Sequence, residues 1–329
     1  MKIEAQSDYS YTQHKWIIRS VITVISLLFI YIYFSSWAGW ERIEQTVALL
    51  SHSWLFVGAL GMVFLSIAVR VARWLYYGRH FDWPIPAVPS SMAFIASIAL
   101  TATPGKAGEL VKSALLRMRY GTALSESAGV LLIERLTDLI AIVLFAVVGM
   151  SFFTGFGHYV LLSVVLLPPL VLFLGKFPLR NVLLAAQARS ERSKKFIAGL
   201  LRLLDTAGSL LRPKPFIIGS LFALIAWSCE VMALYLIMLQ LLPDLLIAPW
   251  VAFGVFGLAT IVGVLVLLPG GVGGFEATAI FLLIQFGATP ADAAIVTIVF
   301  RSITLWLMSF IGLIVLILWL VVNRNKNVR

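Results

Sequence analysis

The sequence is poor in cysteine and in charge, and both shortages narrow what the protein can be. Its single cysteine, Cys229, can form no intramolecular disulfide and no cysteine-based metal site. Only 12% of the residues are charged, against about 25% in a typical soluble domain, whereas 61% are hydrophobic. Several apolar stretches reach the roughly 20 residues that a helix needs to cross the hydrocarbon core of a bilayer. This composition indicates an all-α integral membrane protein.

Familiar catalytic motifs are absent as well. The sequence has no GxxxxGK(S/T) phosphate loop, so it does not hydrolyse ATP by that route. HExxH, GxSxG and CxxC patterns are missing too, and with them the commonest signatures of proteases, hydrolases and redox enzymes. The histidines show no ligand spacing. We therefore expect no enzyme activity, no metal and no cofactor.

The net charge of +10 is concentrated in one stretch. Residues 176–215 are rich in lysine and arginine and contain only two acidic residues, Glu191 and Asp205. A basic loop between membrane spans is typical of the cytoplasmic side. The loop is therefore interpreted as a topology determinant that contacts anionic lipid headgroups, and nucleic acid is not an expected partner.

Orienting the chain from this loop gives a consistent map of about six transmembrane helices. All but three of the lysines and arginines then lie in the cytoplasm, since Arg42 is external and Arg135 and Arg301 lie within spans. The map places both termini in the cytoplasm of a prokaryotic inner membrane. The expected spans are about 16–37, 53–73, 124–153, 158–175, 215–241 and 290–322.

The chain also contains a weak copy of itself. PGKAGE at Pro104 is followed by a long helical segment that contains Arg135, and PGGVGGFE at Pro269 is followed by one that contains Arg301. The apolar segments that contain these glycines, about 87–119 and 248–286, are broken near their middle. On the map they enter from opposite faces, which predicts two re-entrant hairpins arranged as an inverted repeat.

This interpretation gives one polytopic membrane domain over residues 1–329. Repeat one covers about 53–153, the basic cytoplasmic loop covers 176–215, and repeat two covers about 215–322. Irregular backbone at membrane depth is tolerated only where it is buried in protein or lines a wet cavity. We therefore expect the two breaks to meet at one transport site.

Charged residues inside the expected spans are costly, so each needs a partner or a use. In the functional interpretation, Arg135 and Arg301, with Lys106, bind a phosphate that passes through the membrane. Glycines at the breaks let backbone N–H groups approach the anion, and Glu109 and Glu276 stand near helix N-termini. The remaining candidate residues are Glu134, Asp138, Glu230, Gly105, Gly108, Gly270, Gly271, Gly273 and Gly274.

A structural interpretation uses the same residues as an ion-pair network. Arg135 then pairs with Glu134 or Asp138, and Arg301 pairs with Glu230 or Glu276. In that case the charges only hold the helices together.

At these motifs the sequence resembles the membrane part of lysylphosphatidylglycerol synthase/flippase proteins. PGKAGE with LLIERLTD, and PGGVGGFE with GATPADAAIVTIVFR, carry the resemblance, which extends from about the second to the sixth span. It implies a polytopic flippase for anionic lipids, such as aminoacyl-phosphatidylglycerol or polyprenyl-phosphate-linked sugars. No aminoacyl-transferase domain follows within the chain, so lipid synthesis is not implied.

We therefore expect a protein that moves an anionic phospholipid or a polyprenyl-phosphate-linked lipid through a crevice between inverted repeats. Its partners are this substrate and membrane lipids, with a homo-oligomer or a lipid-synthesis enzyme left open. The alternatives are a membrane-embedded polyprenyl-phosphate glycosyltransferase, a non-transporting regulator of a lipid or cell-wall synthase, and a small-solute carrier.

Overall fold

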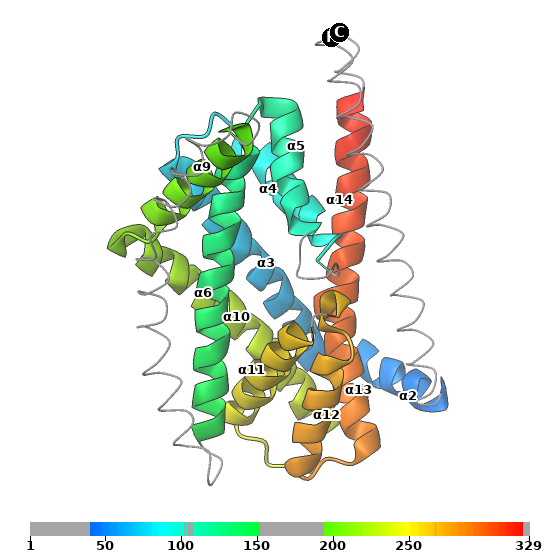
Figure 1. The fold of residues 1–329 in the computed structure, drawn as a ribbon. Helices are drawn as coiled ribbons and strands as arrows, with labels where there is room; N and C mark the ends of the chain where they lie inside the picture. Colours follow the sequence, from blue (N-terminus) through cyan, green and yellow to red (C-terminus); the bar gives the residue numbers. More distant parts are fainter. Residues whose placement is uncertain (1–39, 102, 104–107, 152–193, 267, 325–329) are drawn as a thin grey trace.

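A computed structural model describes the chain except for residues 1–39, 102, 104–107, 152–193, 267 and 325–329 (Figure 1). All regular secondary structure in the described residues is helical, which confirms the all-α class. The first half contains α2 (Trp40–Ser51), α3 (Trp54–His80), α4 (Ala87–Ile98), α5 (Val111–Tyr120) and α6 (Leu124–Ser151). The second half contains α9 (Lys194–Leu210), α10 (Pro213–Leu241), α11 (Pro249–Leu265), α12 (Gly274–Gln285), α13 (Pro290–Arg301) and α14 (Leu307–Arg324).

Four of the six expected spans coincide with helices. Within the described residues, α3, α10 and the continuous segment Pro290–Val322 are long and apolar enough to cross a membrane. Helix α6 has the required length but carries several charges, among them Glu134, Arg135 and Asp138. The expected spans at 16–37 and 158–175 lie outside the described residues.

Helix ends follow local rules that are readable in the sequence. The Ser53 side chain accepts a hydrogen bond from the Phe56 N–H and caps α3, and Thr289 caps α13 by accepting from the Asp292 N–H. Proline occupies the first turn of α10, α11 and α13, where its missing N–H costs nothing. Gly121 ends α5 in the left-handed conformation, with φ of 70°.

Both apolar segments break where the glycines stand. Helix α4 ends at Ile98 and α5 begins at Val111, and between them the Thr103 hydroxyl accepts a hydrogen bond from the Gly108 N–H. The second break lies between α11 and α12 and contains a short 3-10 turn, Pro269–Gly271. Gly270, Gly271 and Gly273 have φ between 66° and 88°, which L side chains rarely adopt.

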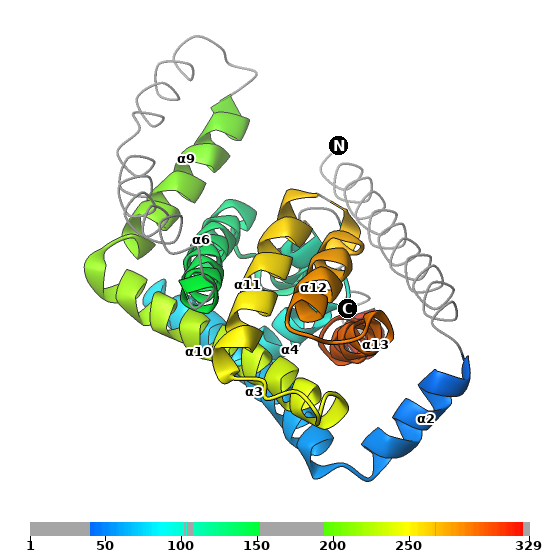
Figure 2. The ribbon, with the colours of Figure 1, turned by 90° about the horizontal axis from the view of Figure 1, so that it is seen from below.

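Helices α3 and α10 pack side by side in antiparallel directions (Figure 1, Figure 2). At one end of the pair the Ser53 hydroxyl donates to the Gln240 side chain, 2.6 Å away. At the other end the Tyr77 ring lies directly against Gly219, where a Cβ would collide with its hydroxyl. The contacts therefore match the start of each helix with the end of the other.

The last long helix of each half packs against a short helix of the other half. Helix α6 packs on α11, where Gly149 lies against Gly254 and Ala146 against Gly257. Helix α14 packs on α4, where Gly312 lies against Ala99. The last helix of each half thus contacts the helix that precedes the glycine-rich break in the other half.

The stretch 176–215 contains more structure than a loop. Its described part forms α9, an amphipathic helix whose Leu203 and Thr206 lie against Gly129 of α6. Ile197 and Leu210 are buried on the same helix. Apolar residues at helical spacing within a basic sequence explain why this part folds onto the bundle.

Candidate functional site

Charged side chains from four elements meet inside the bundle. They lie about 10 to 20 Å along α3 and α6 from His80 and Leu124, at a rise of about 1.5 Å per residue. We call them the charged cluster: Arg70, Arg73, Glu109, Lys112, Glu134, Arg135, Asp138 and Glu230. These described residues comprise four cations and four carboxylates.

Asp138 is the centre of the charged cluster, because three arginines converge on its carboxylate. The Arg73 Nη1 donates to Oδ1 over 2.8 Å. Arg135 Nη2 and Arg70 Nη1 lie 3.3 Å and 3.8 Å from Oδ2. Two of the three arginines come from α3 and the third from α6, so the crossing of these helices creates the arrangement.

The other three carboxylates each hold one cation at short distance. Glu230 of α10 accepts from Arg70 over 2.8 Å, and Ser66 also donates to it. Glu109, just before α5, accepts from Arg135 over 2.9 Å.

Lys112 is fully buried, and its Nζ lies 2.6 Å from Glu134 Oε2. Aromatic rings cover the ammonium group, with the ring centres of Trp74 and Phe94 at 4.3 Å and 4.6 Å. Ring faces attract cations, and the Arg70 guanidinium likewise lies over Trp227 at 4.1 Å. Ion pairs and aromatic faces together offset the cost of removing these charges from water.

The pairing within the charged cluster is incomplete. Arg73 Nε, Arg135 Nε, Glu134 Oε1 and Asp138 Oδ2 are buried without a hydrogen-bond partner in the described structure. Such atoms are rare in folded proteins, because each one forfeits its hydrogen bond to water. Arg73 Nε faces Glu134 Oε1, but the two atoms are 3.9 Å apart, too far for a hydrogen bond.

The second half of the chain contains a simpler arrangement. Arg301 donates from Nε to Glu276 Oε1 over 2.8 Å and from Nη2 to the Gly270 carbonyl over 2.6 Å. Its guanidinium lies over Phe275, and the other Glu276 oxygen accepts from the Gly273 N–H. The arginine therefore joins the end of α13 to the glycine turn and to the start of α12.

The same type of ion pair occurs within each half of the chain. In each, the glutamate that follows the glycine-rich break binds the arginine of a later helix, as Glu109 binds Arg135 and Glu276 binds Arg301. The repeat found in the sequence thus recurs as the same ion pair.

The structure places the predicted site residues in two groups. Glu109, Glu134, Arg135, Asp138 and Glu230 belong to the charged cluster. Gly108 lies at the first break. Around the second break lie Gly270, Gly271, Gly273, Gly274, Glu276 and Arg301. Gly105 and Lys106 lie outside the described residues.

These contacts bear on both interpretations of the charges. Each arginine of the predicted phosphate site is held by a glutamate of its own half, and the structure does not bring Arg135 and Arg301 onto one shared partner. In the ion-pair interpretation, Asp138 and Glu276 are partners as expected, but Glu230 pairs with Arg70 and not with Arg301.

Sequence reasoning missed three members of the charged cluster. Arg70, Arg73 and Lys112 were expected in the cytoplasm, but Arg73 is 1% exposed and Lys112 is 0% exposed. Their proximity to helix ends suggested a cytoplasmic position. The available signal was that Arg70 and Arg73 are three residues apart and so share one helix face.

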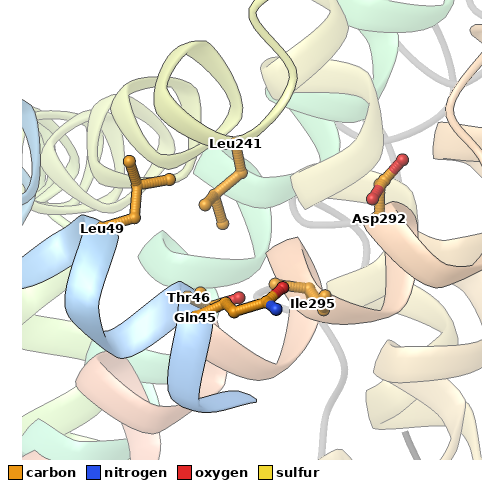
Figure 3. A pocket seen from close by; sticks show the side chains of 6 residues that line it. All are labelled: Gln45, Thr46, Leu49, Leu241, Asp292 and Ile295. Atoms are coloured by element: carbon orange, nitrogen blue, oxygen red, sulfur yellow. The ribbon is translucent and has the colours of Figure 1, made fainter. Parts of the chain in front are cut away.

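A separate pocket lies at the far end of α10 (Figure 3). Its volume is about 230 Å³, and it is formed by α2, α10 and α13. The lining side chains are Gln45, Thr46, Leu49, Leu241, Asp292 and Ile295. Asp292 is engaged in the cap of α13, where it accepts from the Thr289 hydroxyl. The pocket is about 16 Å along α10 from Glu230.

Fold and site together define a multi-pass helical membrane protein with a buried charged cluster. Among the described residues, no group of three His, Cys, Asp or Glu side chains could hold a metal ion. The chain belongs to the family of the lysylphosphatidylglycerol synthase TM region, whose family model matches residues 16–312.

A curated relative has similar length. The UPF0104 membrane protein of Methanothermobacter thermautotrophicus is 24% identical over 328 residues, which covers 91% of this chain and 94% of the relative. No solved structure matches the chain.

Proposed function

We propose that this protein moves an anionic phospholipid or a polyprenyl-phosphate-linked lipid across the prokaryotic inner membrane. Membership of the family favours a lipid-related membrane role. The observation that carries the proposal is the charged cluster, which gathers four cations inside the bundle. Intramembrane charges are expensive and commonly mark a pathway for polar groups.

Access to the charged cluster supports the proposal. The Arg135 side chain is 32% exposed, whereas its partner Asp138 is 4% exposed. A headgroup that slides along the bundle can therefore reach the guanidinium while its acyl or prenyl tails stay in the bilayer. Arginine suits this task, because its planar fork binds phosphate through two parallel hydrogen bonds.

An inverted repeat would give this site access from both sides. Antiparallel packing of α3 and α10, and the exchange of partners by α6 and α14, are the contacts expected between two halves related by a twofold axis in the membrane plane. In Figure 1, α4 and α5 lie in the upper part and α11 and α12 in the lower part. The two broken segments then act as re-entrant hairpins from opposite faces.

Surface charge supports the proposed orientation. The ends of α3, α5 and α14 and the start of α10 lie near one end of the bundle, because His80 contacts Ser209 of α9 and Arg119 contacts Trp319. Basic side chains there are Arg79, Arg117, Arg119, Arg212 and Lys214. Glu44, Asp244 and Asp292 stand at the opposite end. Under the positive-inside rule the basic end is cytoplasmic, and we propose that both termini are cytoplasmic too, as in the topology map.

Reconstitution of the purified protein into liposomes tests the proposal. Fluorescent phosphatidylglycerol is placed in the membrane, and a quencher added outside reports how much of it changes leaflet. We expect transfer by the wild type, at least about tenfold slower transfer by Arg135→Gln, and ordinary transfer by Arg79→Gln, an exposed residue of the same charge.

Two outcomes would contradict the proposal. Transfer that is indifferent to Arg135→Gln would assign this arginine to a structural ion pair. Chemical conversion of the labelled lipid, detected by chromatography of the recovered lipids, would favour a membrane-embedded transferase instead.

A further inference from the structure

Three guanidinium groups around a single carboxylate are more donors than that carboxylate can satisfy. A carboxylate binds one guanidinium well through two parallel hydrogen bonds. Asp138 does so partly for Arg73 at 2.8 Å, while Arg135 and Arg70 remain 3.3 Å and 3.8 Å away. Hydrogen bonds between ions are usually about 2.7–2.9 Å long. Two of the three arginines therefore have capacity for another anion.

Unpaired atoms point to the same place. Arg73 Nε and Arg135 Nε are buried donors without an acceptor, and Asp138 Oδ2 is buried without a hydrogen bond. Arg73 is 1% exposed, so its side chain is enclosed by the protein. A tetrahedral phosphate offers more oxygen atoms than a carboxylate and can serve several guanidinium groups at once.

We propose that Arg70, Arg73 and Arg135 form the binding site for the substrate's phosphate group, and that Asp138 is an internal anion that occupies this site between transport cycles. The proposal rests on the proposed function insofar as the phosphate belongs to a lipid headgroup. It replaces a shared clamp of Arg135 and Arg301 with three arginines of the first half of the chain.

The sequence of binding follows from exposure. The phosphate meets Arg135 first, since this is the accessible arginine of the three. It then takes the place of Asp138 Oδ2 beside Arg135 and Arg70, while Asp138 Oδ1 keeps its contact with Arg73. Glu230 and Glu109 hold the outer sides of Arg70 and Arg135 throughout.

An internal anion has a functional consequence. Asp138 competes with the phosphate, so the apparent affinity falls by the fraction of time for which the site is free. A transporter benefits, because a buried site with three arginines and no competitor would hold its substrate too long to release it.

The second half of the chain lacks this capacity. Arg301 already donates from Nε and Nη2 at 2.8 Å and 2.6 Å, and its carboxylate partner is also bound by the Gly273 N–H. The two arginines of the repeat therefore differ in role, with phosphate binding assigned to the charged cluster.

Equilibrium binding tests the proposal apart from transport. The purified full-length protein in detergent is titrated with phosphatidylglycerol, and bound lipid is counted by native mass spectrometry, with phosphatidylcholine as the zwitterionic control. We expect Arg70→Gln and Arg135→Gln to weaken phosphatidylglycerol binding by about tenfold or more, and Arg79→Gln to leave it within about twofold. Asp138→Asn should strengthen it by about tenfold, because the competitor loses its charge.

Arg135→Lys is the control that separates loss of the binding site from loss of folding. It keeps the charge and a partner for Glu109 but removes the guanidinium fork, so weaker phosphatidylglycerol binding by a normally folded protein supports the site. If Asp138→Asn does not fold, this variant and Arg70→Gln decide the matter.

The proposal is overturned if folded Arg70→Gln and Arg135→Lys bind phosphatidylglycerol like the wild type, or if folded Asp138→Asn binds it less well. Competition by inorganic phosphate would support the site and assign recognition to phosphate itself, whereas tight lipid binding without such competition would support it and assign recognition to the lipid diester. Arginine-dependent lipid binding without leaflet transfer would support the phosphate site and contradict the proposed function. Leaflet transfer with lipid binding that does not depend on the arginines would support the proposed function and contradict the phosphate site.

Discussion

Lys112 gives the sharpest stability prediction at the level of single residues. Its ammonium group is fully buried, paired with Glu134 at 2.6 Å and covered by Trp74 and Phe94. Lys112→Met preserves the length of the side chain but leaves the Glu134 carboxylate without its close partner. We expect a loss of about 3–5 kcal/mol in the free energy of unfolding, measured by denaturant titration in detergent.

The double variant Lys112→Met/Glu134→Gln is the internal control. Removing both charges should recover a large part of the loss, because an unpaired buried charge costs more than a neutral pair. Arg79→Met, an exposed cation on α3, should stay within about 0.5 kcal/mol of the wild type. An equal loss in the single and double variants would show that Lys112 stabilises by packing alone.

The residues of the repeat could be found in the sequence, whereas the rest of the charged cluster could not. Glu109, Arg135, Glu276 and Arg301 stand at matching positions, and the structure pairs them within each half. The contacts of Asp138 with Arg70 and Arg73 depend on how α3 crosses α6. A crossing is set by packing of whole helices, which local sequence patterns do not report.

At the scale of elements, the crossing of α6 and α11 depends on Gly149. A Cβ at Gly149 would collide with the backbone of Gly254, whereas a Cβ at Gly254 would lie 3.3 Å from Gly149. We expect Gly149→Ala to cost about 1–3 kcal/mol through overpacking, and Gly254→Ala to cost less than about 1 kcal/mol. Thermal unfolding of both variants in detergent measures the difference. Equal losses would mean that the helices separate freely at this contact.

Substitution of Gly108 tests whether the first break requires a glycine. At Gly108 a Cβ would collide with the Leu100 carbonyl and lie 2.8 Å from the Thr103 hydroxyl, which binds the Gly108 N–H. Gly108→Ala should therefore lower the melting temperature and weaken the Glu109–Arg135 pair, with a cost of about 1–3 kcal/mol.

Gly61→Ala is the matched control for this break, since nothing lies within 4 Å of the added atom in α3. It should leave the melting temperature unchanged or slightly higher, because alanine favours a helix over glycine. A similar melting temperature for Gly108→Ala and Gly61→Ala would show that packing at the first break does not require a glycine.

Several helix boundaries in the structure have a local cause in the sequence. Helices α10, α11 and α13 begin at Pro213, Pro249 and Pro290, and α5 and α12 end just before Gly121 and Gly287, because these residues act on the backbone directly. Helix α9 was missed, since its basic residues dominated its apolar periodicity. The expected span 290–322 is interrupted by a π-helical turn, Ser302–Trp306, directly after Arg301. Ser302 and Thr304 donate to carbonyls four residues earlier, a contact that bends helices.

At the scale of the whole molecule, the two halves have similar helix arrangements but differ in their buried charged residues. Each half contains a long helix, a broken helical pair and a second long segment, and the contacts exchange between halves. Among the residues that the structure describes, only those of the first half, with Glu230 from α10, form the charged cluster. Under the proposed function, an equal fold with unequal charge would give one binding site and two related access routes.

This arrangement predicts which side of the membrane each end of the bundle faces. In a Cys229→Ala background, single cysteines replace two exposed residues, Lys214 in the first turn of α10 and Asp244 just beyond its last residue. A membrane-impermeant maleimide added to intact cells should label Asp244→Cys at once and Lys214→Cys only after permeabilisation, because the orientation proposed from the positive-inside rule puts the basic end in the cytoplasm. The antiparallel α3 supplies an independent pair, and His52→Cys should react from outside and Arg79→Cys from inside. Labelling of His52→Cys and Lys214→Cys from the same side would contradict the antiparallel crossing, and with it the inverted repeat.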